Sequence, residues 1–259
     1  MFDEIKRVLI TIKAYPNPSK KYGETVCVAG VDIDTHKWIR LYPIPFRDLD
    51  ENKKFKKYNI IEVKVEKSKD DHRPESFKID TDSIKILNHF DTVKDKKWNQ
   101  RKEIVFSHID KSMCEILKEN ESNKKSLGIF KPANIEFFWE KAAEKDESDR
   151  EACYAQHDLF KKEKNVIENI PFDFRYKFKC SEKPDCPGHD YLIIDWEIGQ
   201  SYRSWRNNYS SQELLLEKIK ERWYTRICSD KNDIYFFVGN MKRFPNNFMI
   251  LGTFYPPKI

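Results

Sequence analysis

The sequence predicts a β-rich α+β protein whose middle segment is charged and partly helical. Three observations support this fold class. Runs of β-branched and aromatic residues, which favour strands, recur toward both ends of the chain. Between them, residues 140–164 are densely charged, as in a solvated helix or an inserted linker. A later segment carries apolar residues at helical spacing behind a capping motif.

The beginning of the chain predicts a set of strands. Residues 8–14 form an apolar run that ends at a Tyr-Pro-Asn-Pro segment, where the prolines lack the N–H donor of a central strand. Residues 25–33 and 38–42 predict a hairpin around a polar turn. Residues 59–66 alternate, as in a strand with one face in water, and residues 83–87 predict another short strand.

The middle of the chain predicts a short helix and a strand before the charged segment begins. Residues 110–120 place Met113 and Ile116 on one helical face, with Asp110 at the cap position. Residues 134–139 have the composition of a strand. We therefore expect residues 110–170 to form a helical, charged connector or insertion.

The end of the chain predicts a second set of strands with two helices. Residues 174–180 alternate between apolar and polar side chains, which indicates a half-buried strand. A short apolar run at 191–194 precedes a helix over 196–205. A capping box from Ser210 to Glu213 then opens a helix over 211–225. Two strands, 234–238 and 248–255, flank a turn that contains Pro-Asn-Asn.

Composition limits the class of protein. The 259 residues are enough for two ordinary domains, and we expect modules over 1–109 and 171–259 on either side of the connector. Aromatic residues make up 14%, which argues against disorder. The net charge of +5 is a mild basic excess, which does not by itself establish a polyanion as partner.

The sequence predicts a cytoplasmic protein that does not enter the membrane. Its first residues, MFDEIKRVLI, are unlike a signal peptide, and no run of about 18 apolar residues predicts a membrane span. Widely spaced cysteines in such a chain are expected to be reduced thiols. The six cysteines are Cys27, Cys114, Cys153, Cys180, Cys186 and Cys228.

Several motifs resemble the prokaryotic dual OB-containing domain family. They are YPNPSKKYGE at 15–24, WIRLYPIPFR at 38–47, CPGH at 186–189, DWE at 195–197, FPN at 244–246 and FYPP at 254–257. The matches span most of the chain, although residues 67–165 carry little of the pattern. The resemblance implies two OB-like β-barrel modules, an association with nucleic acid or with antiviral defence, and a protein partner in a defence complex. It implies no known reaction and no catalytic residues.

Cys180, Cys186 and His189 are candidate metal ligands. Zinc prefers thiolate and imidazole, and Cys186 and His189 have a spacing typical of a ligand pair, with Gly188 allowing a sharp turn between them. The alternative is a reduced thiol at a strand end and a hydrogen-bonded loop histidine. A fourth ligand is missing nearby, and the candidates for it are Cys228, Cys153, His157 or water.

His189, Asp195 and Glu197 are candidate catalytic residues. Carboxylates at a strand end can hold Mg²⁺ for phosphodiester chemistry. The alternative interpretation makes Asp195 the N-cap of the helix that starts at Trp196, with Glu197 in its first turn. No glycine-rich phosphate loop or nucleophile elbow is present in the sequence.

Basic and aromatic residues interleave at several places, as they do where cations track phosphates and rings stack on bases. The alternative is that the aromatic rings belong to the core and their basic neighbours face water; for Trp223, on the apolar helical face, we favour the core. The candidate nucleic-acid-binding residues are Lys20, Lys21, Tyr22, Arg40, Tyr42, Arg47, Tyr202, Arg203, Trp205, Arg206, Lys242 and Arg243.

Three functions follow as hypotheses. The first is a protein of a prokaryotic defence system that binds nucleic acid or a nucleotide signal through basic and aromatic faces of OB-like barrels. The second is a metal-dependent nuclease or phosphodiesterase. The third is an interaction scaffold in which the Cys/His loop holds structural zinc. The sequence does not decide whether the protein is an enzyme.

Overall fold

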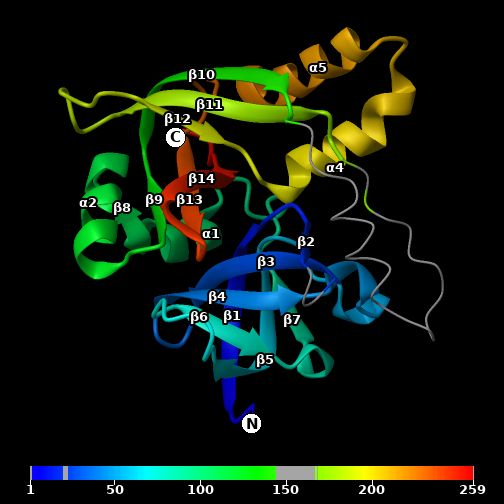
Figure 1. Ribbon diagram of the computed structural model, residues 1–259, viewed down its shortest axis with the longest axis vertical. Helices are drawn as coiled ribbons and strands as arrows, with labels where there is room; N and C mark the ends of the chain where they lie inside the picture. The colour runs from blue at the N-terminus through cyan, green and yellow to red at the C-terminus, as the bar shows by residue number, and fades with distance from the viewer. Residues whose placement is uncertain (1, 20–22, 144–166, 168, 259) are drawn as a thin grey trace.

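The first half of the molecule is a closed five-stranded barrel (Figure 1). A computed structural model describes residues 2–19, 23–143, 167 and 169–258. Strand β5 pairs with β1, which closes the barrel. Strands β4 and β6 pair with each other in parallel. In order around the barrel the strands are β1 (Glu4–Lys13), β3 (Gly23–Asp32), β4 (Lys37–Ile44), β6 (Ser76–Ile79) and β5 (Asn59–Lys67). Strand β2 (Asn17–Ser19) pairs with β3, and β7 (Lys85–His89) pairs with β5.

Strand β1 is buried on both faces, which explains its continuous apolar run. Val8 and Ile10 point into the barrel core. Leu9 and Ile12 point the other way, into a cluster shared with the rest of the chain. A strand with two buried faces lacks the alternation of a half-exposed one.

The second half contains two sheets and most of the helices. One sheet has the order β10 (Pro132–Lys141), β11 (Phe172–Cys180), β12 (His189–Leu192). The other has the order β14 (Phe244–Phe254), β13 (Tyr235–Met241), β9 (Leu127–Phe130), β8 (Ile109–Asp110). Strand β9 leads into β10 after one residue, and a parallel bridge between Ile193 and Ile250 joins the end of β12 to β14.

Aromatic side chains fill the core between these sheets. The rings of Tyr176 and Phe236 stack with their centroids 4.7 Å apart. The Tyr176 hydroxyl donates a hydrogen bond to the Trp223 carbonyl at 2.6 Å. Trp223 is itself buried, so the prediction that it belongs to the core is confirmed.

The predicted helices of the second half are present. Helix α4 (Trp196–Trp205) follows β12, and α5 (Gln212–Lys220) continues into a π-helix (Glu221–Arg226). Ser211, one residue after the predicted cap, accepts a hydrogen bond from the Leu214 amide. Both helices lie beside the β10–β11–β12 sheet (Figure 1), and the start of α4 also reaches the barrel, where the Trp196 ring lies 5.6 Å from that of Phe46.

The structure differs from the expected connector over 110–170. Residues 109–141 form β8, α2 (Met113–Asn123), β9 and β10. Strand β8 pairs with β9, β9 with β13, and β10 with β11. The predicted helix over 110–120 and strand over 134–139 are present as α2 and β10. Sequence patterns did not show that these elements belong to the second half, because the partners of the strands lie far along the chain. Ser112, rather than Asp110, caps α2 by accepting from the Glu115 amide. Most of the charged segment lies outside the described residues.

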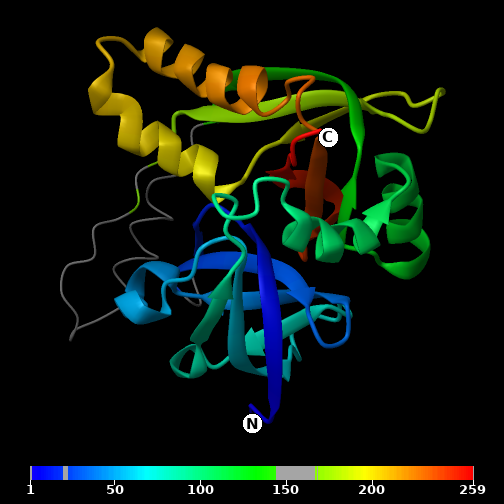
Figure 2. The ribbon, with the colours of Figure 1, turned by 180° about the vertical axis from the view of Figure 1, so that it is seen from behind.

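The two halves share a hydrophobic core where they meet. Leu9 and Ala29 of the barrel belong to one buried cluster with Phe237 and Phe254 of the second half. Helix α1 (Asn99–Val105) lies at this junction, as seen from behind (Figure 2), and contributes Val105 to the cluster. None of the helices in the described part of the chain has the length and apolar character needed to cross a bilayer.

Gly30 allows β3 to pass close to β1. A Cβ at this position would lie 2.0 Å from the Leu9 carbonyl oxygen, so the two backbones would have to separate. We expect Gly30→Ala to lower the free energy of unfolding by about 1–3 kcal/mol or more. Urea unfolding measures this. Gly252→Ala is the control. A Cβ there would lie no closer than 3.3 Å to its nearest atom, an Asp195 oxygen, so a shift of a few tenths of an ångström makes room for it. An equal effect of the two substitutions would contradict the explanation.

Candidate metal centre and ligand pocket

Three cysteines and one histidine of the second half converge on one point. Cys114 lies in the first turn of α2, Cys180 ends β11, Cys186 lies in the following turn, and His189 begins β12. Their donor atoms all lie within 4.8 Å of one another. The predicted ligands Cys180, Cys186 and His189 are therefore brought together, and Cys114 is the fourth member.

The spacing of the donors fits a tetrahedral metal ion. His189 Nε2 lies 3.5 Å from the sulfurs of Cys114 and Cys180 and 3.4 Å from that of Cys186. The Cys114 sulfur lies 3.8 Å from Cys186 and 3.9 Å from Cys180. A tetrahedral zinc with ordinary bond lengths separates two sulfurs by about 3.8 Å, and a sulfur and a nitrogen by about 3.6 Å.

The local backbone positions the ligands. Gly188 has φ +93°, a conformation that side chains disfavour, and this allows the sharp turn between Cys186 and His189. The Cys180 amide donates to the Cys186 sulfur at 3.3 Å. The ring of Phe178 stacks on that of His189 at 5.2 Å, which holds the imidazole. The residues present thus fit a metal ion such as zinc.

The fourth ligand differs from the predicted ones. Cys228 lies instead beside the Trp223 carbonyl, 3.5 Å away. Cys153 and His157 lie outside the described residues. Cys114 had no local pattern to identify it, because it lies 66 residues before Cys180 and on a helix.

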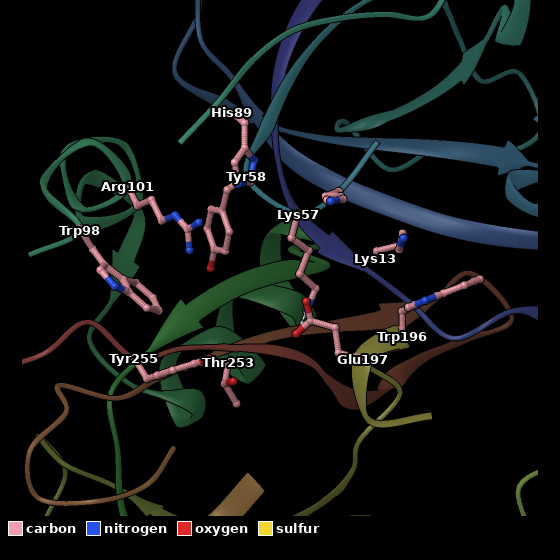
Figure 3. Close-up of a pocket in the computed structure, with 11 residues that line it drawn as sticks. Lys13, Lys57, Tyr58, His89, Trp98, Arg101, Trp196, Glu197, Thr253 and Tyr255 are labelled. Carbon is pink, nitrogen blue, oxygen red and sulfur yellow. Dashed lines mark ion pairs between the residues drawn. The ribbon is translucent and has the colours of Figure 1, made fainter. Parts of the chain in front are cut away.

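A pocket of about 300 Å³ opens where the two halves meet (Figure 3). Cations, aromatic rings and one carboxylate line it. Its walls come from β1, the segment before β5, β7, α1, α4 and β14. The lining residues are Lys13, Lys56, Lys57, Tyr58, His89, Trp98, Arg101, Trp196, Glu197, Thr253 and Tyr255.

Lys13 is a buried cation without an ion-pair partner. Its residue is 8% exposed, and no carboxylate among the described residues lies within ion-pair distance of its ammonium. The ammonium instead lies over aromatic rings, 3.9 Å from the centre of Phe46 and 4.5 Å from that of Trp196. Burial, reinforced by the charge of Lys57, lowers the pKa of Lys13 to about 8.

Lys57 is a second buried cation, and it is paired. Its ammonium contacts both Asp195 oxygens at 2.6 and 2.7 Å and Glu197 at 3.5 Å. Burial alone would lower the pKa of Lys57, but the charges of Asp195 and Glu197 raise it. Burial raises the pKa of Asp195, against the opposing effect of Lys57.

The other side of the pocket is aromatic. The Arg101 guanidinium lies 3.7 Å from the ring centre of Tyr58 and 4.9 Å from that of Trp98. It donates to the Phe90 carbonyl through Nε and Nη2, at 2.9 and 2.6 Å. Tyr58 and Trp98 have positive φ angles, 64° and 57°. Bulky residues rarely adopt this conformation, and such strain concentrates at functional sites.

The predicted catalytic residues are divided between these two places. His189 lies among the thiols, whereas Asp195 and Glu197 lie at the pocket. Asp195 is the N-cap of α4 and accepts from the Glu197 amide at 3.0 Å, so the capping interpretation is confirmed. Its 1% exposed side chain also pairs with Lys57.

Arg40, a predicted nucleic-acid contact, lies at the junction of the two halves. It is 4% exposed, and its guanidinium donates to the Ser126 carbonyl and hydroxyl at 3.2 and 3.1 Å. Trp38, two residues earlier on β4, meets Phe237 edge to face at 6.1 Å. The outer face of β4 therefore packs against the second half.

The remaining predicted contacts come from separate elements. Tyr42 is partly exposed on β4, Arg47 pairs with Glu24 at 2.7 Å, and Tyr202 is buried beside Phe174. Lys242 donates to the Asp70 carbonyl across the two halves. Of the others, Arg203 and Trp205 are half-buried, Arg206 and Arg243 are exposed, and Lys20, Lys21 and Tyr22 lie outside the described residues.

Two family profiles divide the chain at the same place as the structure. A domain of unknown function, DUF8758, matches residues 4–107, and another, DUF8757, matches residues 109–259. The boundary lies between α1 and β8, where the first half ends. No curated protein matches the chain.

Proposed function

The chain belongs to the DUF8757 family, a domain of unknown function, and we propose from its own geometry that it binds a nucleotide ligand, free or within a nucleic acid. The ligand site is the pocket between the two halves. The sequence already suggested binding of nucleic acid or of a nucleotide signal. The residues that line the pocket differ from the binding residues predicted from the sequence.

The observation that carries the proposal is Lys13. A buried ammonium without a carboxylate partner is costly, and an anionic ligand would relieve that cost. Lys56, Lys57 and Arg101 add positive charge to the same pocket, against Glu197 and the Asp195 beneath it. Aromatic rings line the rest. Phosphate and a planar base are the two chemical groups that such a lining suits.

We also propose that both halves are OB-like barrels. In the first half the chain order is β1, β3, β4, β5, β6, with β4 beside β6 in parallel and β5 closing onto β1. In the second half β9–β10, β11, β12, β13 and β14 repeat this connectivity, with the parallel bridge between Ile193 and Ile250 in place of the parallel pair. OB-like barrels are five-stranded Greek-key barrels that bind nucleic acids through their second and third strands.

The packing of the barrels favours the pocket over the usual face. The second and third strands of the first barrel are β3 and β4, and Ala29 and Trp38 on them pack into the junction. That face is therefore covered by the second half. The pocket beside it, reached by Lys13 at the end of β1, stays open to a ligand.

For the Cys/His cluster we propose zinc in a structural role. Three thiolates and an imidazole form a four-ligand set typical of structural zinc, which leaves no position for a reacting water. The metal would tie α2 to the turn between β11 and β12. The proposal therefore keeps the structural zinc of the scaffold hypothesis and combines it with a ligand pocket.

Metal-dependent phosphodiester cleavage stays an alternative that the arrangement does not favour. Asp195 is engaged by Lys57 and by the α4 amide, and His189 lies among the thiols. If the alternative held, Asp195→Ala would abolish Mg²⁺- or Mn²⁺-dependent cleavage. The role in prokaryotic defence, with a protein partner, stays a prediction from the resemblance.

Binding of nucleotides and nucleic acids by calorimetry tests the proposal. Single-stranded and duplex DNA, RNA and free nucleotides form the panel. Affinity should fall as salt rises, because the contacts are ionic. It should also fall as pH rises through about 8, because Lys13 then loses its proton and its attraction for phosphate. Absence of binding by every member of the panel would contradict the proposal.

A further inference from the structure

We infer that the ligand is a single nucleoside phosphate, with its phosphate beside Lys13 and Lys57 and its base against Trp98 and Tyr255. This inference rests on the proposed function and narrows it to one class of ligand. It also assigns Glu197 a role, as an internal anion that the phosphate displaces.

The size of the pocket fits one nucleotide. Its volume, about 300 Å³, lies at the lower end of the range for small-molecule sites, about 300–1,000 Å³. The pocket combines an apolar, aromatic wall with a few convergent polar groups, as small-molecule sites do. A site for a long polymer is instead a groove that tracks several phosphates.

The two sides of the pocket differ in chemistry, as Figure 3 shows. Lys13, Lys57, Glu197 and Trp196 lie on one side. The ammonium of Lys13 is held in place by the Trp196 ring, so it is positioned before any ligand arrives. A phosphate there would meet two ammonium groups, of which only Lys57 has carboxylate partners among the described residues.

The opposite side suits a base. The rings of Trp98 and Tyr255 lie 5.0 Å apart and are inclined by 61°. The Arg101 guanidinium is fixed between Tyr58 and Trp98, and the Phe90 carbonyl occupies two of its donor nitrogens. Its Nη1 has no hydrogen-bond partner among the described residues and can donate to a base or a ribose oxygen.

Glu197 competes with the phosphate for the Lys57 ammonium. Its side chain is 56% exposed and lies 3.5 Å from Lys57, whereas Asp195 is buried beneath and holds the same ammonium more closely. A phosphate entering the pocket would therefore replace Glu197 without disturbing Asp195. Neutralising Glu197 removes the competing charge and its repulsion of the ligand.

The test measures binding of the four nucleoside 5′-monophosphates, the corresponding nucleosides, inorganic phosphate and single-stranded oligonucleotides to the full chain. We expect the affinity of at least one monophosphate to exceed those of its nucleoside and of inorganic phosphate by about tenfold or more. Lys13→Gln should weaken this binding by about tenfold or more, and Trp98→Ala by a similar factor. Glu197→Gln should strengthen it by several-fold.

The control is Lys54→Gln, a neighbouring lysine that pairs with Glu51 at the surface. It should leave binding unchanged. Glu197→Gln keeps the inference falsifiable if Lys13→Gln or Trp98→Ala misfolds, because loss of a merely structural contact would not raise affinity. Circular dichroism checks the fold of each variant.

The outcomes separate this inference from the proposed function. If oligonucleotides bind and Lys13→Gln weakens them, but no monophosphate binds, the inference is overturned and the proposed function stands. If phosphate binds as tightly as the monophosphates, or Glu197→Gln lowers affinity, the assignment of the two sides is overturned. If no member of the panel binds, both fall.

Discussion

Replacing Cys114 with serine is expected to remove the metal ion and to unfold the second half of the protein. Structural zinc sites contribute directly to folding, and their loss belongs to the small group of changes that cost more than about 4 kcal/mol. Cys114 is the member of the Cys/His cluster that α2 supplies, whereas the other three residues come from β11, β12 and the turn between them. Its loss would therefore release the helix from the sheet.

Elemental analysis and thermal unfolding measure the effect. The unaltered protein, purified without chelator, should carry zinc at about one atom per chain, and Cys114→Ser should carry little. Cys228→Ser is the matched control, because this thiol of the same half contacts the Trp223 carbonyl and lies outside the four-residue cluster. Stoichiometric zinc in Cys114→Ser, or none in the unaltered protein, would contradict the metal centre.

Local spacing in the sequence identified three of the four residues of the Cys/His cluster. Cys180, Cys186 and His189 were predictable because they lie close together in the sequence, at the end of one strand and in the turn that leads to the next. Cys114 was not, since α2 reaches the site only through the pairing of β9 with β13 and of β10 with β11. A lone cysteine in the first turn of a helix carries no pattern that indicates its partner.

The pocket was still harder to predict, because its residues come from six separate elements. Lys13 ends an apolar strand, and a strand pattern alone treats a final lysine as the point where the strand reaches water. The capping role of Asp195 follows from its neighbours and was predictable. Its pairing with Lys57, 138 residues earlier, depends on how the two halves dock.

The barrel itself was predicted in part. Strands with clear alternation or apolar runs were found, but β6 and β9 are four residues long and lack a strong pattern. The closing of β5 onto β1 is a contact between distant segments. Local propensity indicates a strand and leaves its partner open.

The second large effect is expected at the Lys57–Asp195 pair, which joins the two halves. Asp195→Asn keeps a good N-cap for α4, because asparagine caps as well as aspartate. It removes the closer of the two carboxylates that balance Lys57, whose side chain is 8% exposed, and leaves only the 56% exposed Glu197 at 3.5 Å. Leaving one charge of a buried pair without its partner costs about 3–5 kcal/mol. Because Glu197 still contacts Lys57 in Asp195→Asn, we expect a loss toward the lower end of this range. Lys57→Met should cost a similar amount for the converse reason.

The double variant distinguishes charge balance from packing. If the cost comes from an uncompensated charge, Lys57→Met combined with Asp195→Asn should recover much of the loss, because no buried charge remains at the pair. Urea unfolding of the four proteins gives the coupling free energy. Additive losses would contradict the explanation.

The pH dependence of Lys57→Met gives an independent check on the same pair. Burial already raises the pKa of Asp195, and removal of Lys57 takes away the main charge that opposes this shift. The folded state then binds a proton at pH values where the unfolded state has lost it, so stability falls as pH rises above the ordinary pKa of an aspartate. Asp195→Asn removes that titrating group, and the double variant should lose the pH dependence that Lys57→Met introduces. Persistence of that dependence in the double variant would assign it to another group.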